Sequence, residues 1–246
     1  MNKLGLILLE RAVLFSKEGK ESKVIIELEA RIGTRNQNFV SGVEKQDFDT
    51  VLKAMHGLLG VKNMVSERTT LKDRSIVRVE QHQIEDYLYG HGIRMRSVQN
   101  QKEIKQKVPI AFDDLRVSQR KYDFRIALNQ EVEVQTALTF PEGKRQQNRT
   151  TFHTSDHCKI ELSEVLSPNA SYEIEVEHLG SSATETIEEQ AASWIFWILK
   201  ILNLTREEEP KILYVRTLSS TEKVTSDIDI VSVSRGGLSA PWPNKK

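Results

Sequence analysis

The chain has 246 residues, of which 38% are hydrophobic and 28% are charged. This is the composition of an ordinary globular protein, and no stretch approaches the roughly 18 to 20 apolar residues that a membrane span needs. The apolar run Leu4–Leu9 is broken by Glu10 and Arg11, so it lacks the length of a secretory signal, and we expect a protein that is not secreted. Lysine plus arginine and aspartate plus glutamate each number 35. Because a protein that coats long nucleic acid is usually basic, we expect any contact with nucleic acid to involve only one end of it.

Hydrophobic periodicity predicts a short helix, a strand and a second helix in the N-terminal part of the chain. In chain order these are Gly5–Glu18, Lys23–Ile32 and Asp47–Leu59. A succession of short alternating runs with polar breaks follows, which predicts a meandering sheet or barrel. The runs are Ser75–Glu80, Gly92–Val98, Glu103–Ile110, Lys121–Glu133, Lys144–His153, His157–Val165 and Ser171–His178.

The C-terminal part predicts one amphipathic helix, Thr186–Leu204, in which we expect Trp194 and Trp197 to be core residues. Two strand-like runs follow, Lys211–Leu218 and Ile228–Val233, and then a Gly/Pro-rich segment. We therefore expect a single domain over residues 1–235 and a tail or linker over residues 236–246.

Charged residues occupy one face of each predicted strand. Because alternate side chains of a strand point to opposite faces, Glu27 and Glu29 share one face, and Glu173, Glu175 and Glu177 share another. The remaining strands place mainly arginine and lysine on their polar face. For any single strand, the simplest interpretation is that the charged face is exposed to solvent. A solvated face, however, normally mixes charges of both signs. The full set favours an α+β fold: a closed antiparallel β-barrel of about eight strands that forms a charged tunnel, flanked by outer helices.

Such an interior suits phosphoryl transfer to water. Clustered carboxylates need a cation to remain ionised together, and their hard oxygen ligands suit Mg²⁺ or Mn²⁺. A set of arginine and lysine side chains suits a polyphosphate. The sequence has no P-loop motif and no Gly-x-Ser-x-Gly motif. Cys158, the only cysteine, is expected to be a packed small side chain. A Cys/His nucleophile or a histidine metal pair with His153 and His157 stays an alternative.

Four segments resemble motifs of the triphosphate tunnel metalloenzymes. Ile26–Gly33 resembles the first acidic motif and Tyr172–Glu177 the second, while Arg145–Phe152 and Lys159–Ser163 resemble the two basic strands between them. The resemblance is strongest to the capping-enzyme β-subunit branch, the RNA 5′-triphosphatases of fungi, protists and large DNA viruses. A lone Glu-x-Glu has no diagnostic value, but two such motifs that bracket two basic strands in this order are specific.

The resemblance implies a role for each matching residue. Glu27, Glu29 and Glu177 would bind the metal, with Glu175 supporting them, and Glu131 would position the attacking water. The expected phosphate contacts are Arg94, Lys107, Arg125, Arg145, Arg149 and Lys159, with Arg96 and Lys105 as rivals of Arg94 and Lys107. Glu161 and Ser163 would hold the clamp in place through hydrogen bonds. Gln147 departs from the pattern, because a lysine usually stands there, and it removes one cation from the clamp.

Three functions follow from this resemblance. The first is a metal-dependent RNA 5′-triphosphatase that removes the γ-phosphate of nascent mRNA in the first step of cap formation. Its partners would be the 5′-triphosphate end of RNA, nucleoside triphosphates in vitro, and a guanylyltransferase that is separate or fused; no membrane partner is expected. The second is a tripolyphosphatase or nucleoside triphosphatase without a role in RNA, and the third a binding subunit without catalysis. The expected location is nuclear for a cellular eukaryotic protein, and cytoplasmic or virion-associated for a viral one.

Overall fold

The computed structural model describes residues 24–67, 70–135, 140–179, 187–205 and 230–232. The predicted helix Gly5–Glu18, the run Lys211–Leu218 and the tail lie outside these residues. The strands are β1 (Val24–Arg35), β2 (Phe39–Ser41), β3 (Met64–Glu67), β4 (Thr70–Asp73), β5 (Ile76–Tyr89), β6 (Ile93–Val98), β7 (Gln101–Val117), β8 (Asp123–Glu133), β9 (Gly143–Thr154), β10 (Cys158–Ser167), β11 (Ser171–His178) and β12 (Ile230–Ser232). The helices are α2 (Lys45–Gly57), α3 (Ile187–Leu204) and the short 3-10 turn η2 (Gly90–Gly92).

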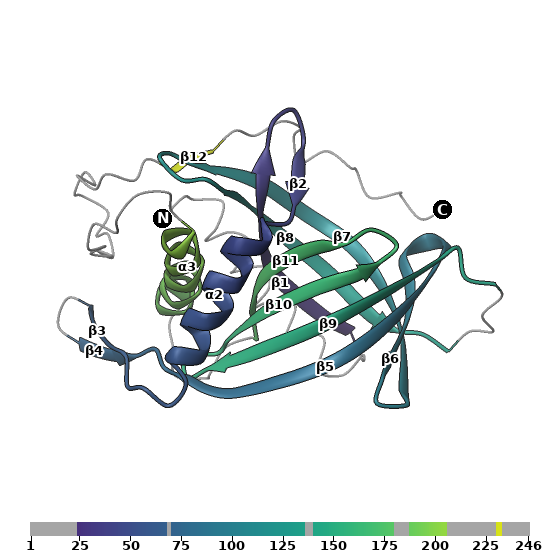
Figure 1. Ribbon diagram of the computed structural model, residues 1–246, viewed down its shortest axis with the longest axis horizontal. Coiled ribbons are helices and arrows are strands. Elements are labelled where there is room, and N and C mark those ends of the chain that lie inside the picture. Colours follow the sequence, from purple (N-terminus) through teal and green to yellow (C-terminus); the bar gives the residue numbers. More distant parts are fainter. Residues whose placement is uncertain (1–23, 68–69, 136–139, 180–186, 206–229, 233–246) are drawn as a thin grey trace, which may run out of the picture.

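Eight of the strands form a closed barrel (Figure 1). Their order is β11-β10-β9-β5-β6-β7-β8-β1, and pairing between β11 and β1 closes the circle. Every pairing in the barrel is antiparallel. Outside the circle, β2 pairs with β1, β12 pairs with β7, and β3 and β4 form a separate hairpin. The predicted closed antiparallel barrel of an α+β fold is therefore confirmed.

Helices α2 and α3 lie together against the outside of the barrel (Figure 1). Phe48, Val51 and Met55 of α2 belong to one buried hydrophobic cluster with side chains of α3 and the outward-facing residues of the strands. The barrel contributes Leu28, Ala30, Ile32, Phe124, Ile126, Leu128, Ile160, Leu162, Ile174 and Val176 to this cluster. The apolar core thus lies between the barrel wall and the helices, and the charged faces of the strands point inward.

Both tryptophans of α3 are anchored in this core, as predicted. Trp194 and Trp197 are almost fully buried. The Nε1 of Trp194 donates to the carbonyl oxygen of Val176 at 2.9 Å, and the Nε1 of Trp197 donates to the Oδ1 of Asp156 at 3.0 Å. Cys158 is also fully buried in the same cluster, which agrees with a packed thiol. No helix in the described part of the chain is long and apolar enough to cross a membrane.

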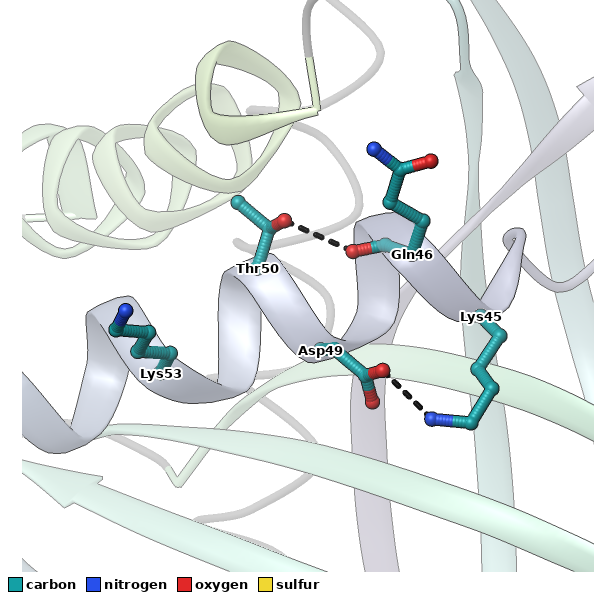
Figure 2. A pocket seen from close by; sticks show the side chains of 5 residues that line it. All are labelled: Lys45, Gln46, Asp49, Thr50 and Lys53. Carbon is teal, nitrogen blue, oxygen red and sulfur yellow. Dashed lines mark hydrogen bonds and ion pairs between the residues drawn. The ribbon is translucent and has the colours of Figure 1, made fainter.

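The solvent-facing side of α2 carries a shallow polar depression (Figure 2). Lys45, Gln46, Asp49, Thr50 and Lys53 line it. The Nζ of Lys45 donates to the Oδ2 of Asp49 at 2.6 Å, and the Oγ1 of Thr50 donates to the carbonyl oxygen of Gln46 at 2.8 Å. These are local contacts one helical turn apart, so the depression is the solvated face of a helix and not a functional site.

Candidate active site in the barrel interior

A cavity of about 210 Å³ lies inside the barrel, and its lining is almost entirely charged. Nine carboxylates face it: Glu27, Glu29, Asp86, Glu103, Glu131, Glu161, Glu173, Glu175 and Glu177. Eight cations face it: Arg31, Arg94, Arg96, Lys105, Lys107, Arg145, Arg149 and Lys159. Ile25 and Gln147 complete the lining. Apart from Arg125, every side chain singled out for the catalytic and metal site from the sequence lies in this one cavity.

The pairing of β1 with β11 builds the acidic wall of the cavity. In this ladder Glu29 lies opposite Glu177, and Arg31 lies opposite Glu175. Like charges at directly paired positions are unfavourable, and the arrangement is maintained by neighbouring cations. Lys107 lies between the carboxylates of Glu27 and Glu29, with its Nζ 3.0 Å from the Oε2 of Glu29. The residues expected to bind metal are thus held together by β-sheet pairing and by a lysine.

Asn129 on β8 also contacts the two acidic residues of β1. Its Nδ2 donates to the Oε1 of Glu29 at 3.2 Å and to the Oε2 of Glu27 at 3.5 Å. Asn129 is 5% exposed, so a buried amide orients these carboxylates. The sequence analysis did not single it out.

The protonation behaviour of the acidic wall reflects its crowding. Burial, together with Glu175, raises the pKa of Glu29. Burial raises the pKa of Glu177 to about 7, with Glu27 and Glu161 acting in the same direction against Lys159. For Glu175, burial favours the neutral acid, but Arg31, Arg149 and Lys107 outweigh it and lower the pKa to about 2. Glu29 and Glu177, two of the three carboxyls expected to bind metal, are therefore the ones whose negative charge is poorly compensated.

The basic strands β9 and β10 continue the barrel wall next to β11, with which β10 pairs directly. Arg149 donates from Nε to the Oγ of Ser163 at 2.9 Å and forms an ion pair with Glu161. The Nζ of Lys159 lies 3.0 Å from the Oε1 of Glu161 and also contacts Glu177. The structure thus contains the hydrogen bonds that were expected to hold the clamp.

Strands β6 and β7 supply four further cations. The choice between Arg94 and Arg96, and between Lys105 and Lys107, does not arise, because residues two apart on a strand share a face and all four line the cavity. Arg94 donates from Nη2 to the Oε1 of Glu131 at 3.2 Å, and the Nζ of Lys105 lies 3.5 Å from the Oε2 of the same residue. Glu131, the residue expected to orient water, is therefore an anion held between two cations.

Asp86 on β5 was missed by the sequence analysis. It is 3% exposed and accepts two hydrogen bonds from Arg96, at 2.9 Å and 3.3 Å. Gln147 also donates to it at 3.1 Å, while the Oε1 of Gln147 accepts from Arg145 at 2.9 Å. The predicted strand Ser75–Glu80 stops short of Asp86, whereas β5 continues to Tyr89. Extending that strand at the same parity would have placed Asp86 on the charged face.

Arg125 is not among the residues that line the cavity. It is paired in register with Arg31, so it belongs to the same inner face. Its guanidinium is held by Asp114, with bonds of 2.6 Å and 3.1 Å, and it lies over the rings of Phe39 and Phe112. The geometry does not bring it together with the other expected phosphate ligands, and its contact with phosphate stays a prediction.

The donor set of the acidic wall fits a divalent cation in its chemistry. In the described parts of the chain, no three acidic, histidine or cysteine side chains are arranged around one point as a preformed metal site. The ammonium groups of Lys107 and Lys159 lie between the carboxylates instead. Glu27, Glu29 and Glu177 offer the oxygen ligands that Mg²⁺ and Mn²⁺ prefer. The raised pKa values of Glu29 and Glu177 mark the place where additional positive charge would be most favourable.

The sequence matches no protein-family model and no curated protein. Among solved structures, the chain is similar to the S. pombe Pct1 RNA triphosphatase, with a TM-score of 0.58 and 16% identity, covering 85% of this chain and 94% of that chain. The structure of the same S. pombe protein in complex with the Spt5 CTD matches with a TM-score of 0.58 and 17% identity over the same shares. The Mimivirus capping enzyme triphosphatase is more distant, with a TM-score of 0.46 and 10% identity over 78% of this chain and 95% of that chain. The chain therefore shares its fold with the S. pombe RNA triphosphatase.

Proposed function

We propose that this protein is a metal-dependent RNA 5′-triphosphatase that hydrolyses the γ-phosphate of triphosphate-ended RNA, the first step of cap formation. The observation that carries the proposal is the cavity inside the barrel, where nine carboxylates face eight cations. A cavity that holds acidic and basic side chains on adjoining strands suits a metal-bound polyphosphate. The fold shared with the S. pombe RNA triphosphatase supports the choice of substrate.

The acidic and the basic side chains of the cavity have distinct roles in this proposal. Glu27, Glu29 and Glu177 hold Mg²⁺ or Mn²⁺, which when bound would neutralise charge on the transferred phosphoryl group. Arg145, Arg149 and Lys159 bind the phosphate oxygens from β9 and β10, and Arg94, Lys105 and Lys107 bind them from β6 and β7. Glu175 keeps the nearby cations in position, because it is ionised and flanked by Arg31. A guanylyltransferase, separate or fused, would act on the diphosphate end that remains.

Glu131 is the best placed residue to orient the attacking water. It is 7% exposed, and its two oxygens contact Arg94 and Lys105. These contacts fix the carboxylate in one orientation, which suits positioning of the attacking water. The cations of β6 and β7 are thus placed to bind phosphate on one side and to hold Glu131 on the other.

The proposal is tested by phosphate release from a short triphosphate-ended RNA. We expect release in Mg²⁺ and none in a chelator. The variants Glu27→Gln and Glu177→Gln should lose it while keeping their circular dichroism spectra and melting temperatures. Glu164→Gln is the matched control, since Glu164 lies on β10 but has outward parity. Full activity in both cavity variants would contradict the proposal.

A second function from the sequence analysis uses the same cavity, namely hydrolysis of inorganic tripolyphosphate or free nucleotides without a role in RNA. Comparison of kcat/KM for RNA, ATP and tripolyphosphate in Mg²⁺ separates the two. Turnover of tripolyphosphate without turnover of RNA would support the metal site and would contradict the role in capping.

A further inference from the structure

Phe112 is a hydrophobic side chain placed on the charged inner face of the barrel. On β8, inward residues are odd-numbered, as shown by Glu131 in the cavity lining. In the β7–β8 ladder Phe112 lies opposite Ala127, and Asp114 lies opposite Arg125. A register shift between Pro109 and Ala111 changes the parity of β7, so that Phe112 continues the inward row of Lys105 and Lys107. A β-bulge has therefore directed this ring inward.

The ring of Phe112 is 61% exposed, although its strand belongs to the closed barrel. It stands at the end of the inner face, where β7 extends beyond the cavity. At roughly 3.3 Å per residue, the five residues from Lys107 place it about 16 Å along the strand from that lysine. The ring is thus at an open end of the barrel interior, with one face available to solvent.

Phe112 rests on a rigid support. The guanidinium of Arg125 lies 4.7 Å from the centroid of Phe112 and 4.9 Å from that of Phe39. Asp114 fixes the guanidinium with two hydrogen bonds, and Phe39 is itself 9% exposed. Phe39 packs closely on Gly33, where an added Cβ would lie 2.8 Å from the ring Cζ. The exposed ring is therefore backed by a cation and a buried aromatic side chain, which limits its conformational freedom.

The surroundings of the ring favour an anionic ligand chain. Arg35 lies on the inner face of β1 at this end and donates from Nη1 to the carbonyl oxygen of Asp114 at 3.4 Å. Arg116 is exposed and lies two residues after Asp114, so the two side chains are on the same face of β7. A flat exposed aromatic surface flanked by arginines is the combination that binds single-stranded nucleic acid, because bases stack on the ring and phosphates contact the cations.

We propose that the exposed face of Phe112 is the stacking platform for the first base of the RNA whose triphosphate occupies the cavity. This inference rests on the proposed function and extends it to the part of the substrate that is not hydrolysed. It implies that the mouth formed by Phe39, Phe112, Asp114 and Arg125 distinguishes a nucleotide end from inorganic polyphosphate. Arg125 then acts as a positioning residue for the platform.

The test compares steady-state kinetics of two substrates, a triphosphate-ended RNA and inorganic tripolyphosphate. Phe112→Ala should raise the KM for RNA about tenfold, the order expected for loss of one stacked base, with the KM for tripolyphosphate within twofold of wild type. Phe112→Trp should retain wild-type affinity for RNA, and Phe112→Leu should behave as the alanine variant because it lacks a π face. Phe140→Ala is the matched control: Phe140 is 93% exposed but lies in the β8–β9 connection.

A second readout is independent of turnover. RNA with 2-aminopurine as its first base should lose fluorescence on binding to the wild type in a chelator, and should lose much less with Phe112→Ala. An unchanged KM for RNA in Phe112→Ala, or an equal rise for both substrates, would overturn the platform while leaving the triphosphatase intact. Absence of wild-type turnover on RNA would instead count against the proposed function.

Discussion

Along β11, Ile174 and Val176 face the helices and are fully buried, whereas Glu173, Glu175 and Glu177 face the cavity. The two faces of one strand thus pack against opposite kinds of surroundings. Burial of the apolar face stabilises the fold, at roughly 25 cal/mol per Å² removed from water. Burial of the charged face destabilises the fold, because the desolvation of the ions costs more free energy than their pairing contributes. We therefore expect the outer face to determine stability and the inner face to determine activity.

The largest expected effect lies on the outer side. Trp197→Ala should lower the free energy of unfolding by about 3–5 kcal/mol, since it empties a large buried volume and removes the donor that Asp156 accepts. Chemical denaturation measures this, with Phe140→Ala, which should change stability by less than about 0.5 kcal/mol, as control. The fraction that remains folded should keep its kcat. If Trp197→Ala lowered kcat without lowering the free energy of unfolding, the outer face would not be confined to a role in stability.

The inner face should show the reverse pattern. Glu29→Gln should lower kcat/KM for triphosphate-ended RNA at least about 100-fold, because loss of even an outer partner of a metal ligand typically costs 10–100-fold. Its stability should change by no more than about 1 kcal/mol, because the variant removes repulsion from Glu175 while it leaves Lys107 with one carboxylate fewer. Activity assays and melting curves of the same preparation check both statements. Glu164→Gln should alter neither quantity.

The division between the faces also explains what could be read from the sequence. Strict alternation in Ser171–His178 located β11 with its bounds correct, and alternation within each strand placed Glu27 with Glu29, and Glu175 with Glu177, on a polar face. Alternation fails where the sheet is irregular. The predicted strand Glu103–Ile110 ends at the bulge after Pro109, whereas β7 runs to Val117. The mouth residues Phe112 and Asp114 were therefore not recognised.

Other residues were missed for a different reason. On β5 both faces carry polar side chains, because Gln81 and Gln83 follow one parity while His82 and Asp86 follow the other. A pattern of hydrophobicity has no contrast in such a strand, so Asp86 was not assigned. The interaction of Gln147 with Asp86 depends on the pairing of β9 with β5, two strands that are far apart in the sequence. Sequence spacing within one strand carries no information on such contacts.

A smaller effect is expected from a change of charge within the inner face. Gln147→Lys adds a cation beside Asp86, the acceptor of the present amide, and should lower the KM for triphosphate-ended RNA several-fold. Gln146→Lys is the matched control, because Gln146 precedes it on the outward face and donates to Glu85. An increase in KM for Gln147→Lys would mean that repulsion from Arg145 dominates, and that the clamp has no room for a further cation.

The smallest expected effect concerns the junction between the helices and the barrel. Tyr122 donates to the Oδ2 of Asp47 at 2.6 Å and accepts from the backbone N–H of Glu44 at 2.9 Å. Tyr122→Phe should cost about 1 kcal/mol of stability at neutral pH. Burial, reinforced by Asp47, raises the pKa of Tyr122 to about 12, above the value near 10 of an unfolded tyrosine.

The sign of the pH effect at this junction follows from that shift. The folded state favours the neutral phenol, so the contribution of Tyr122 is complete below about pH 10 and is lost as the pH rises toward 12. The stability difference between wild type and Tyr122→Phe should therefore be constant from pH 7 to 9 and should shrink above pH 10. A difference that grows in alkali would show that the ionised phenolate is held by Lys121, which lies 2.8 Å from Asp47.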